Sequence, residues 1–223
     1  MHTARLIGYT QPVDPLDRQF GPRSPADLLA YCARVSSAAN QENHATGPRL
    51  IRSLIRRQEW SPLEMVSVTM EITTTRDVAR QMLRHRSFSF QEFSQRYAEV
   101  DTEELVLREA RDQDPKDRQS STPTAEGGVK DWWLRSQIAT REHIAQTYKA
   151  ALQMGIAKEV ARTILPEGMT PSRLYVAGTL RSWVHYVGLR SQMSTQYEHR
   201  LVAASCWSLL CDLFPDVVGE GGL

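Results

Sequence analysis

The region that decides the fold is residues 65–97, which read MVSVTMEITTTRDVARQMLRHRSFSFQEFSQRY. Apolar and polar residues alternate over 65–72, and this alternation predicts a half-buried β-strand. Thr74, with Asp77 three residues later, predicts the N-terminal cap of the helix that follows. The polar and aromatic stretch 87–96 predicts a loop that leads into another short strand. The most polar residues of the chain therefore follow a helix directly, where their side chains can line a site.

Outside this region we expect one further strand and several helices. Ser24 followed by Pro25 predicts an N-cap with proline at the first helical position. The strand is expected over residues 4–10, and the helices over 26–35, 50–58, 132–154, 158–165, 180–187 and 196–214. Residues 172–178 are interpreted as a link into a helix. Residues 112–128 are predicted to be the least structured part, as an active-site loop, a lid or a disordered excursion. These elements predict the α+β class.

Charge and composition exclude several classes of function. The 223 residues carry 27 Lys and Arg against 26 Asp and Glu, a net charge of +1, so attraction of the whole molecule to nucleic acid or to an anionic membrane is not expected. No run of about 18 apolar residues is present, and the N-terminus lacks a secretory apolar segment. The three cysteines show no metal or disulfide spacing, which suits a reducing cytoplasm.

The helix end and loop at 81–96 concentrate groups that can bind an anion. Gln81 and Arg84 lie three positions apart and share one face of a helix. Ser94 and Arg96 point to the same side if their segment is extended. Guanidinium groups beside hydroxyls are what a phosphomonoester requires. The alternative is a solvated charged loop that binds its own Glu92.

A resemblance to a known family favours the first interpretation. Arg84-His85-Arg86, seven residues, then Ser94-Gln95-Arg96 resembles the signature of the flavin-dependent thymidylate synthases. Further segments resemble the family in the same order along the chain: 32–36, 61–64, 111–121, 159–162, 180–186, 189–190 and 195–200. The resemblance implies a single domain over residues 1–223, with a mixed or antiparallel sheet and long C-terminal helices.

The family reaction methylates dUMP to dTMP. The resemblance implies methylenetetrahydrofolate as carbon donor and FAD, reduced by NADPH, as hydride carrier, which makes the protein an FAD-dependent methyltransferase. It also implies a homotetramer with active sites at subunit interfaces. From the net charge of +1 we expect no nucleic-acid or membrane partner. The residues agree, because no Cys lies near a His or in a polar motif as a nucleophile for the flavin-free route. No Gly-rich dinucleotide fingerprint is present, which fits flavin binding outside a Rossmann fold.

Individual roles follow from the same resemblance. The positions that match dUMP contacts are Gln81, Arg84, Glu92, Ser94, Gln95, Arg96, Arg162 and Arg190. The positions that match FAD contacts are Ser61, Arg84, His85, Arg86, Ser87, Glu92, Thr179, Arg181 and His185. Arg190 and Ser94 are the catalytic candidates: Arg190 matches a position beside the ionised N3 of uracil, and Ser94 is expected to orient dUMP rather than attack it. No His pair has the spacing of a metal site.

One position departs from the family pattern, and several other residues are expected to have structural roles only. Glu59 stands where many members have a flavin-contacting His. His199 is expected on a helix face, and adjacent Trp132 and Trp133 are expected to pack. Two other functions stay open: a flavoenzyme for another pyrimidine nucleotide, and an Arg/aromatic module that binds single-stranded nucleic acid.

Overall fold

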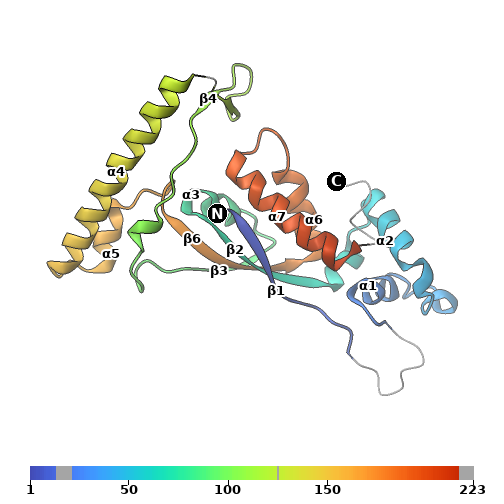
Figure 1. Cartoon of the computed structure of the whole chain (residues 1–223). Coiled ribbons are helices and arrows are strands. Elements are labelled where there is room, and N and C mark those ends of the chain that lie inside the picture. Colours follow the sequence, from blue (N-terminus) through green and yellow to red (C-terminus); the bar gives the residue numbers. More distant parts are fainter. Residues whose placement is uncertain (14–21, 125, 216–223) are drawn as a thin grey trace.

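A four-stranded antiparallel sheet forms the centre of the protein, in a computed structural model that describes residues 1–13, 22–124 and 126–215 (Figure 1). The strand order is β1–β2–β6–β3, with bounds Thr3–Tyr9, Ser67–Thr75, Pro171–Thr179 and Ser89–Glu92 respectively. The longest pairing joins β2 to β6, from Ser67 opposite Thr179 to Thr75 opposite Pro171. The predicted α+β class and antiparallel sheet are confirmed, as are the strands expected at 4–10, at 65–72 and after residue 87.

The interpretation of residues 172–178 as a link is wrong. This segment is β6, which pairs with both β2 and β3. Leu174 and Val176 are buried on one face, whereas Arg173 and Tyr175 point to the other. Residues 172–178 do not show a clear apolar alternation in the sequence. Their strand is identified in the structure by its pairing with β2 and β3.

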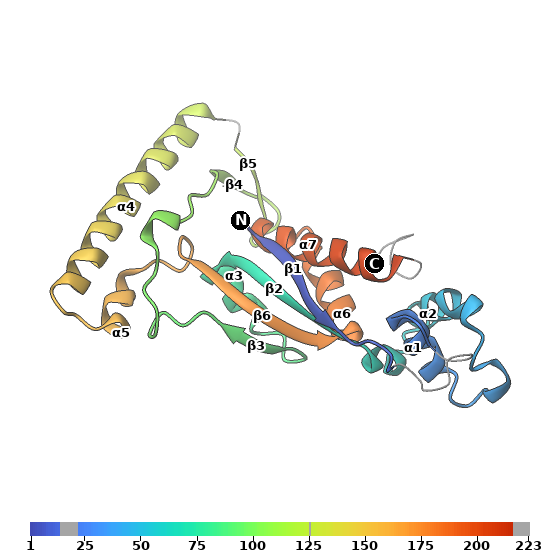
Figure 2. The ribbon, with the colours of Figure 1, turned by 60° about the horizontal axis from the view of Figure 1, so that its bottom comes forward.

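One face of the sheet is covered by helices and the other is half open (Figure 2). Helices α3 (Arg76–Met82), α6 (Leu180–Arg190) and α7 (Tyr197–Leu213) contribute to the apolar cluster with β2 and β6, around Met70, Trp183 and Val202. The open face carries Glu71, which accepts a hydrogen bond from Arg5 at 3.1 Å, and Tyr175, which is 38 % exposed. The two faces therefore offer separate places for a site.

The remaining α-helices lie at the two ends of the sheet (Figure 1). Helices α1 (Pro25–Ala33) and α2 (Gly47–Arg56) are at one end, and α4 (Gly127–Gln153) and α5 (Lys158–Ala161) at the other. The predicted cap of α1 is confirmed, because the Ser24 side chain accepts a hydrogen bond from the Asp27 N–H. Short 3₁₀ turns are Ala38–Asn40, His44–Thr46, Ser61–Met65, Thr102–Glu104 and Arg162–Ile164. No helix in the described ranges is long and apolar enough to cross a membrane.

A second prediction of local structure, the cap at Thr74, is also wrong. Thr74 does not cap α3, because β2 continues through Thr75; the Thr75 hydroxyl instead donates to Asp77 at 2.6 Å. Residues 112–128, for which the sequence left open an active-site loop, a lid or a disordered excursion, include most of a hairpin formed by β4 (Arg111–Gln113) and β5 (Ser121–Pro123). At its tip, the Asp114 and Asp117 side chains accept backbone N–H groups two and three residues later, which is the local bonding that stabilises Asx turns.

Candidate active site

The covered face of the sheet holds a pocket of about 290 Å³. It is formed by the end of α3, the end of α6, the connection to α7 and the tip of the hairpin, and is lined by Gln81, Gln119, Leu189, Arg190, Gln192, Ser194, Thr195 and Gln196. Gln81 and Arg190, distant in sequence and both matched by the resemblance to dUMP contacts, thus line one pocket. The hairpin, held by a hydrogen bond from the Ser120 hydroxyl to the Met193 carbonyl (3.2 Å), is a wall of this pocket.

His85 supports Arg190 at the edge of this pocket. The Arg190 Nε–H donates to His85 Nε2 at 2.9 Å, so His85 is an acceptor there and carries its proton on Nδ1. Burial and the charge of Arg190 lower the pKa of His85 to about 4. The pair therefore consists of a neutral imidazole and a fixed guanidinium, whose remaining N–H groups are available to a ligand.

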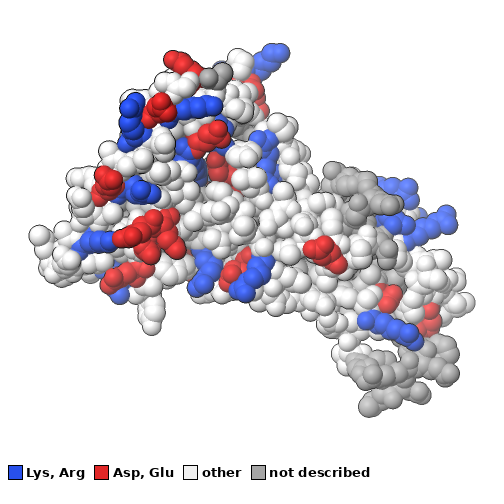
Figure 3. Space-filling model, viewed as in Figure 1, with Lys and Arg blue, Asp and Glu red and all other residues white. Residues whose placement is uncertain are grey.

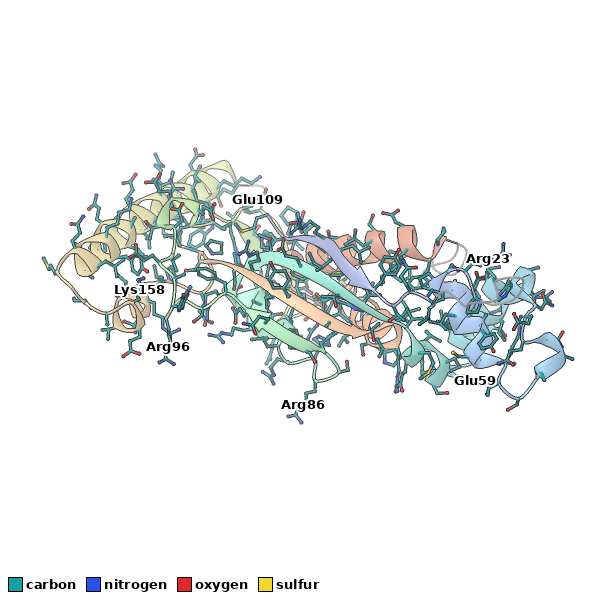
Figure 4. All side chains as sticks on the ribbon, turned by 90° about the horizontal axis from the view of Figure 1, so that it is seen from below. Arg23, Glu59, Arg86, Arg96, Glu109 and Lys158 are labelled. Carbon is teal, nitrogen blue, oxygen red and sulfur yellow. The ribbon has the colours of Figure 1, made fainter. Side chains whose placement is uncertain are left out.

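The loop after α3 is anchored by one aromatic side chain. Phe88 is buried against Trp183, with ring centroids 4.6 Å apart, and Gly178 leaves the space that its ring occupies. Just before this anchor in the chain, Arg84, Arg86 and Ser87 are exposed. Figure 4 shows Arg86 pointing away from the ribbon. The predicted cationic residues of this loop are thus free to contact a ligand from outside the chain.

A second group of predicted residues gathers where β6 passes into α6. Arg181 forms an ion pair with Glu64, and the rings of Trp60 and His185 meet edge to face with centroids 4.3 Å apart. Burial and the charge of Arg181 lower the pKa of His185. The Thr179 hydroxyl accepts from the Ser182 N–H at 3.3 Å as the cap of α6.

This group adjoins the loop of the Arg-His-Arg motif. The Ser182 hydroxyl donates to the Ser87 carbonyl at 3.3 Å, and the predicted residue Ser61 begins the 3₁₀ turn that contains Glu64. Hydroxyls, neutral imidazoles and guanidinium groups therefore surround one edge of the domain. This donor set fits the ring system and pyrophosphate of a flavin dinucleotide.

Ser94 and Arg96 lie elsewhere, on the side of the open sheet face. Ser94 lines a hollow of about 350 Å³ with Gln91 and Tyr175, and a wider one of about 570 Å³ with Arg96. Arg96 Nη2 lies 3.4 Å from Glu159 in an exposed ion pair. In Figure 4 Arg96 lies near Lys158 and apart from Arg86. The structure thus does not bring Ser94 and Arg96 into the pocket of Gln81 and Arg190.

Three other predicted nucleotide contacts have distinct surroundings. One oxygen of Glu92 accepts a hydrogen bond from Ser172 at 2.8 Å and lies 3.2 Å from the buried guanidinium of Arg76. Gln95 is buried, and its Nε2 atom has no hydrogen-bond partner. Arg162 begins the 3₁₀ turn after α5. A buried amide nitrogen without a partner is costly, so Gln95 is a position where an additional acceptor would be stabilising.

Sequence reasoning missed part of the pocket and misplaced one residue. Gln119 and Gln196 line the pocket, but nothing in the sequence distinguished them from other polar loop residues. His199 lies on a face of helix α7, as expected, but its side chain is fully buried and bonds to Gln81. Trp132 is 61 % exposed, so its predicted packing does not occur within this chain. Glu59 pairs with Arg57, at 3.0 Å, and is half exposed.

The charge distribution does not favour a nucleic-acid module. Over α4 and α5, basic and acidic side chains interleave on the face shown in Figure 3, without a continuous basic stripe. Backbone recognition of a nucleic acid needs such a stripe.

Comparisons with known proteins show the family of the chain. The profile of the family described as "Thymidylate synthase complementing protein" matches residues 22–216. The flavin-dependent thymidylate synthase of Synechocystis sp. is 47 % identical over 213 residues, and a probable flavin-dependent thymidylate synthase of Paramecium bursaria Chlorella virus 1 is 42 % identical over 215 residues; each alignment covers 96 % of both chains.

A solved structure resembles the whole chain. The UMP/dUMP methylase PolB from Streptomyces cacaoi, bound with 5-Br dUMP, superposes with a TM-score of 0.74 at 27 % identity, over 96 % of this chain and 91 % of that one. The same methylase bound with 5-Br UMP gives a TM-score of 0.73 at 26 % identity, over 96 % and 95 %. The chain belongs to the thymidylate synthase complementing protein family, the family of the flavin-dependent thymidylate synthases.

Proposed function

We propose that the protein methylates dUMP to dTMP in the cytoplasm, with methylenetetrahydrofolate as carbon donor and NADPH-reduced FAD as hydride carrier. The observation that carries the proposal is the pocket where Arg190, held by neutral His85, faces Gln81. The family and the names of its relatives support it.

Arg190 supplies a fixed positive charge for the pyrimidine. Methylation at C5 requires electron density at that carbon, and negative charge then develops on the ring carbonyls and N3. A preorganised cation in a partly buried pocket stabilises such charge without reorganisation. Because His85 accepts from Nε and stays neutral, it orients the guanidinium and adds no competing charge.

Ser94, Arg96 and Arg162 are proposed to hold the 5′-phosphate. Ser94 acts as a hydrogen-bond donor, because a serine nucleophile needs a free base and neighbouring Glu92 is already engaged by Arg76 and Ser172. Since Ser94 lies on the other side of the sheet from Arg190, a second copy of the chain must complete each site. We therefore propose a homotetramer with its active sites between subunits.

Exposed apolar surface supports such an assembly. Trp132 and Leu134 on α4 are 61 % and 47 % exposed, and Figure 2 shows none of the described helices lying over the open face of the sheet. A closed oligomer buries surfaces of this kind.

The residues around the start of α6 are proposed to hold FAD. Arg86 and Arg181 would bind its pyrophosphate, hydroxyls of Ser61, Ser87 and Thr179 its polar chain, and neutral His185 its ring edge. When bound, FAD supplies the hydride that completes the methyl group. Glu64 orients Arg181 through their ion pair.

The direct test is conversion of dUMP to dTMP by the purified protein, followed chromatographically, with FAD, NADPH and methylenetetrahydrofolate. We expect a yellow protein that releases FAD on denaturation. We expect dTMP to form only when methylenetetrahydrofolate is added. UMP is the comparison substrate, since a structural neighbour binds 5-Br UMP. A protein that stays colourless with FAD and dUMP, and makes no dTMP, contradicts the proposal. Methylation of UMP but not of dUMP would show instead that the substrate is the other pyrimidine nucleotide.

The phosphate contacts have their own test. Loss of charge-assisted hydrogen bonds of about 1.5–3 kcal/mol each predicts that deoxyuridine binds at least about tenfold more weakly than dUMP. Arg96→Ala should remove most of that difference. Equal binding of dUMP and deoxyuridine by the wild type would contradict the phosphate role.

A further inference from the structure

A chain of hydrogen bonds runs behind the pocket wall, starting from two carboxylates. The Gln196 side-chain amide Nε2 donates to Asp77 Oδ2 and Glu198 Oε2, both at 3.1 Å. The Gln81 Nε2 then donates to Gln196 Oε1 at 2.6 Å. Both glutamines line the pocket. This series of hydrogen bonds therefore links the two carboxylates, through Gln196, to Gln81, which lines the pocket.

The carboxylates fix the direction of this chain. Burial alone would raise the pKa of Asp77, but hydrogen bonds, above all from Arg108 at 2.8 Å, lower it overall. Glu198 is likewise kept ionised, chiefly by hydrogen bonds from its own backbone N–H and from Arg111 at 2.5 Å. An ionised carboxylate only accepts, so Gln196 must turn its NH₂ toward both and its oxygen toward Gln81.

His199 closes the other half of the chain. Its Nδ1 lies 3.1 Å from Gln81 Oε1, and its Nε2 lies 3.1 Å from the Tyr186 hydroxyl. Since Gln81 presents an oxygen there, His199 must carry its proton on Nδ1, and Tyr186 donates to Nε2. Full burial, with the charge of Arg190, lowers the pKa of His199 to about 3, so the ring is neutral at physiological pH.

We infer that Gln196 and His199 are positioning residues that hold the Gln81 amide in one direction, so that its second Nε2 hydrogen meets the C4 carbonyl of uracil. This inference rests on the proposed function. Cytosine carries an amino group at C4 where uracil has a carbonyl. This amino group would face the Gln81 Nε2–H, and two donors that face each other both remain without an acceptor. A rotated amide would present its oxygen and accept the amino group. The chain thus makes Gln81 a specificity determinant for uracil over cytosine.

The test compares dUMP and dCMP binding, by calorimetry, in full-length FAD-loaded variants. His199→Leu removes the donor to Gln81, and Gln196→Met removes the link to the carboxylates. Each should weaken dUMP binding by about fivefold and lower the dUMP-to-dCMP affinity ratio by about tenfold, while kcat at saturating dUMP changes less than KM. His199→Asn should recover most of the ratio, because its amide N–H can replace Nδ1–H.

The controls separate this inference from the proposed function. His143→Leu, at an exposed position of α4, should leave the ratio unchanged. If the wild type fails to bind dUMP, the proposed function fails and the inference with it. If the wild type makes dTMP but both Gln196→Met and His199→Leu keep the wild-type ratio, only the inference is overturned. Should His199→Leu not fold, Gln196→Met decides.

Discussion

Two inactive variants should restore each other if each site is built from two copies of the chain. Arg190→Ala removes the cation from the pocket on the covered face, and Arg96→Ala removes the phosphate contact on the open side. Each loses charge-assisted hydrogen bonds of about 1.5–3 kcal/mol apiece, so with two bonds lost we expect roughly one per cent of wild-type activity or less. In a random one-to-one mixture, about a quarter of the sites combine two intact halves.

The assay is dTMP formation by assemblies co-expressed with two different affinity tags and purified through both. We expect about a quarter of the wild-type rate, many times that of either parent. Arg190→Ala mixed with Gln81→Ala is the matched control, because both residues lie in one pocket and no mixed site is then complete. Doubly tagged assemblies that are no more active than their parents would refute the claim that each site is built from two copies of the chain. Recovery of activity in the control pair would refute the claim that Gln81 and Arg190 of one site come from the same copy.

The remaining predictions concern catalysis, pH and packing. Ser94→Ala should slow turnover by about 5- to 30-fold and Arg190→Ala by more, as measured at saturating dUMP; complete inactivity of Ser94→Ala with normal ligand binding would reverse these roles. The pKa of His199 is lowered to about 3 in the folded state, so the unfolded state binds more protons below pH 6.5. The contribution of His199 to the free energy of unfolding therefore falls by about 2 kcal/mol from pH 7 to pH 5. Urea unfolding at both pH values should show a smaller loss in His199→Asn, and an equal loss would argue against a buried neutral His. Gly178→Ala would place a Cβ 2.3 Å from Phe88 Cδ1, so thermal unfolding should report about 1–3 kcal/mol of destabilisation; an unchanged melting temperature would mean that the Phe88 ring moves freely.

Local signals in the sequence predicted the elements whose stabilising contacts are local. Ser24 caps α1 through the Asp27 N–H three residues away, and the alternation at 65–72 matches one buried face of β2. Residues 172–178 failed as a prediction because β6 depends on partners distant in sequence, pairing on one side with β2 and on the other with β3. Thr74 failed for the same reason, since pairing with β6 extends β2 through Thr75 at the expense of the cap.

The site divides in the same way. The resemblance to the family named Gln81 and Arg190, and the structure brings them to one pocket. Gln119 could not be predicted, because its place in the wall depends on a hairpin held by Ser120. His199 has no local signal either: its burial and its bond to Gln81 follow from how α7 packs on the sheet.

The spacing within the Arg-His-Arg motif describes a path along the sheet rather than a single contact surface. Between Arg86 and Ser94 the chain buries Phe88 and then runs as β3 along β6, from Ser89 opposite Ala177 to Glu92 opposite Leu174. Four residues of strand cover roughly 13 Å. The strand thus carries Ser94 and Arg96 away from Gln81 and toward the open face. In the proposed homotetramer, the two ends of this motif therefore belong to different sites. The symmetry of the assembly, in which every copy gives and receives the same groups, would then complete each site.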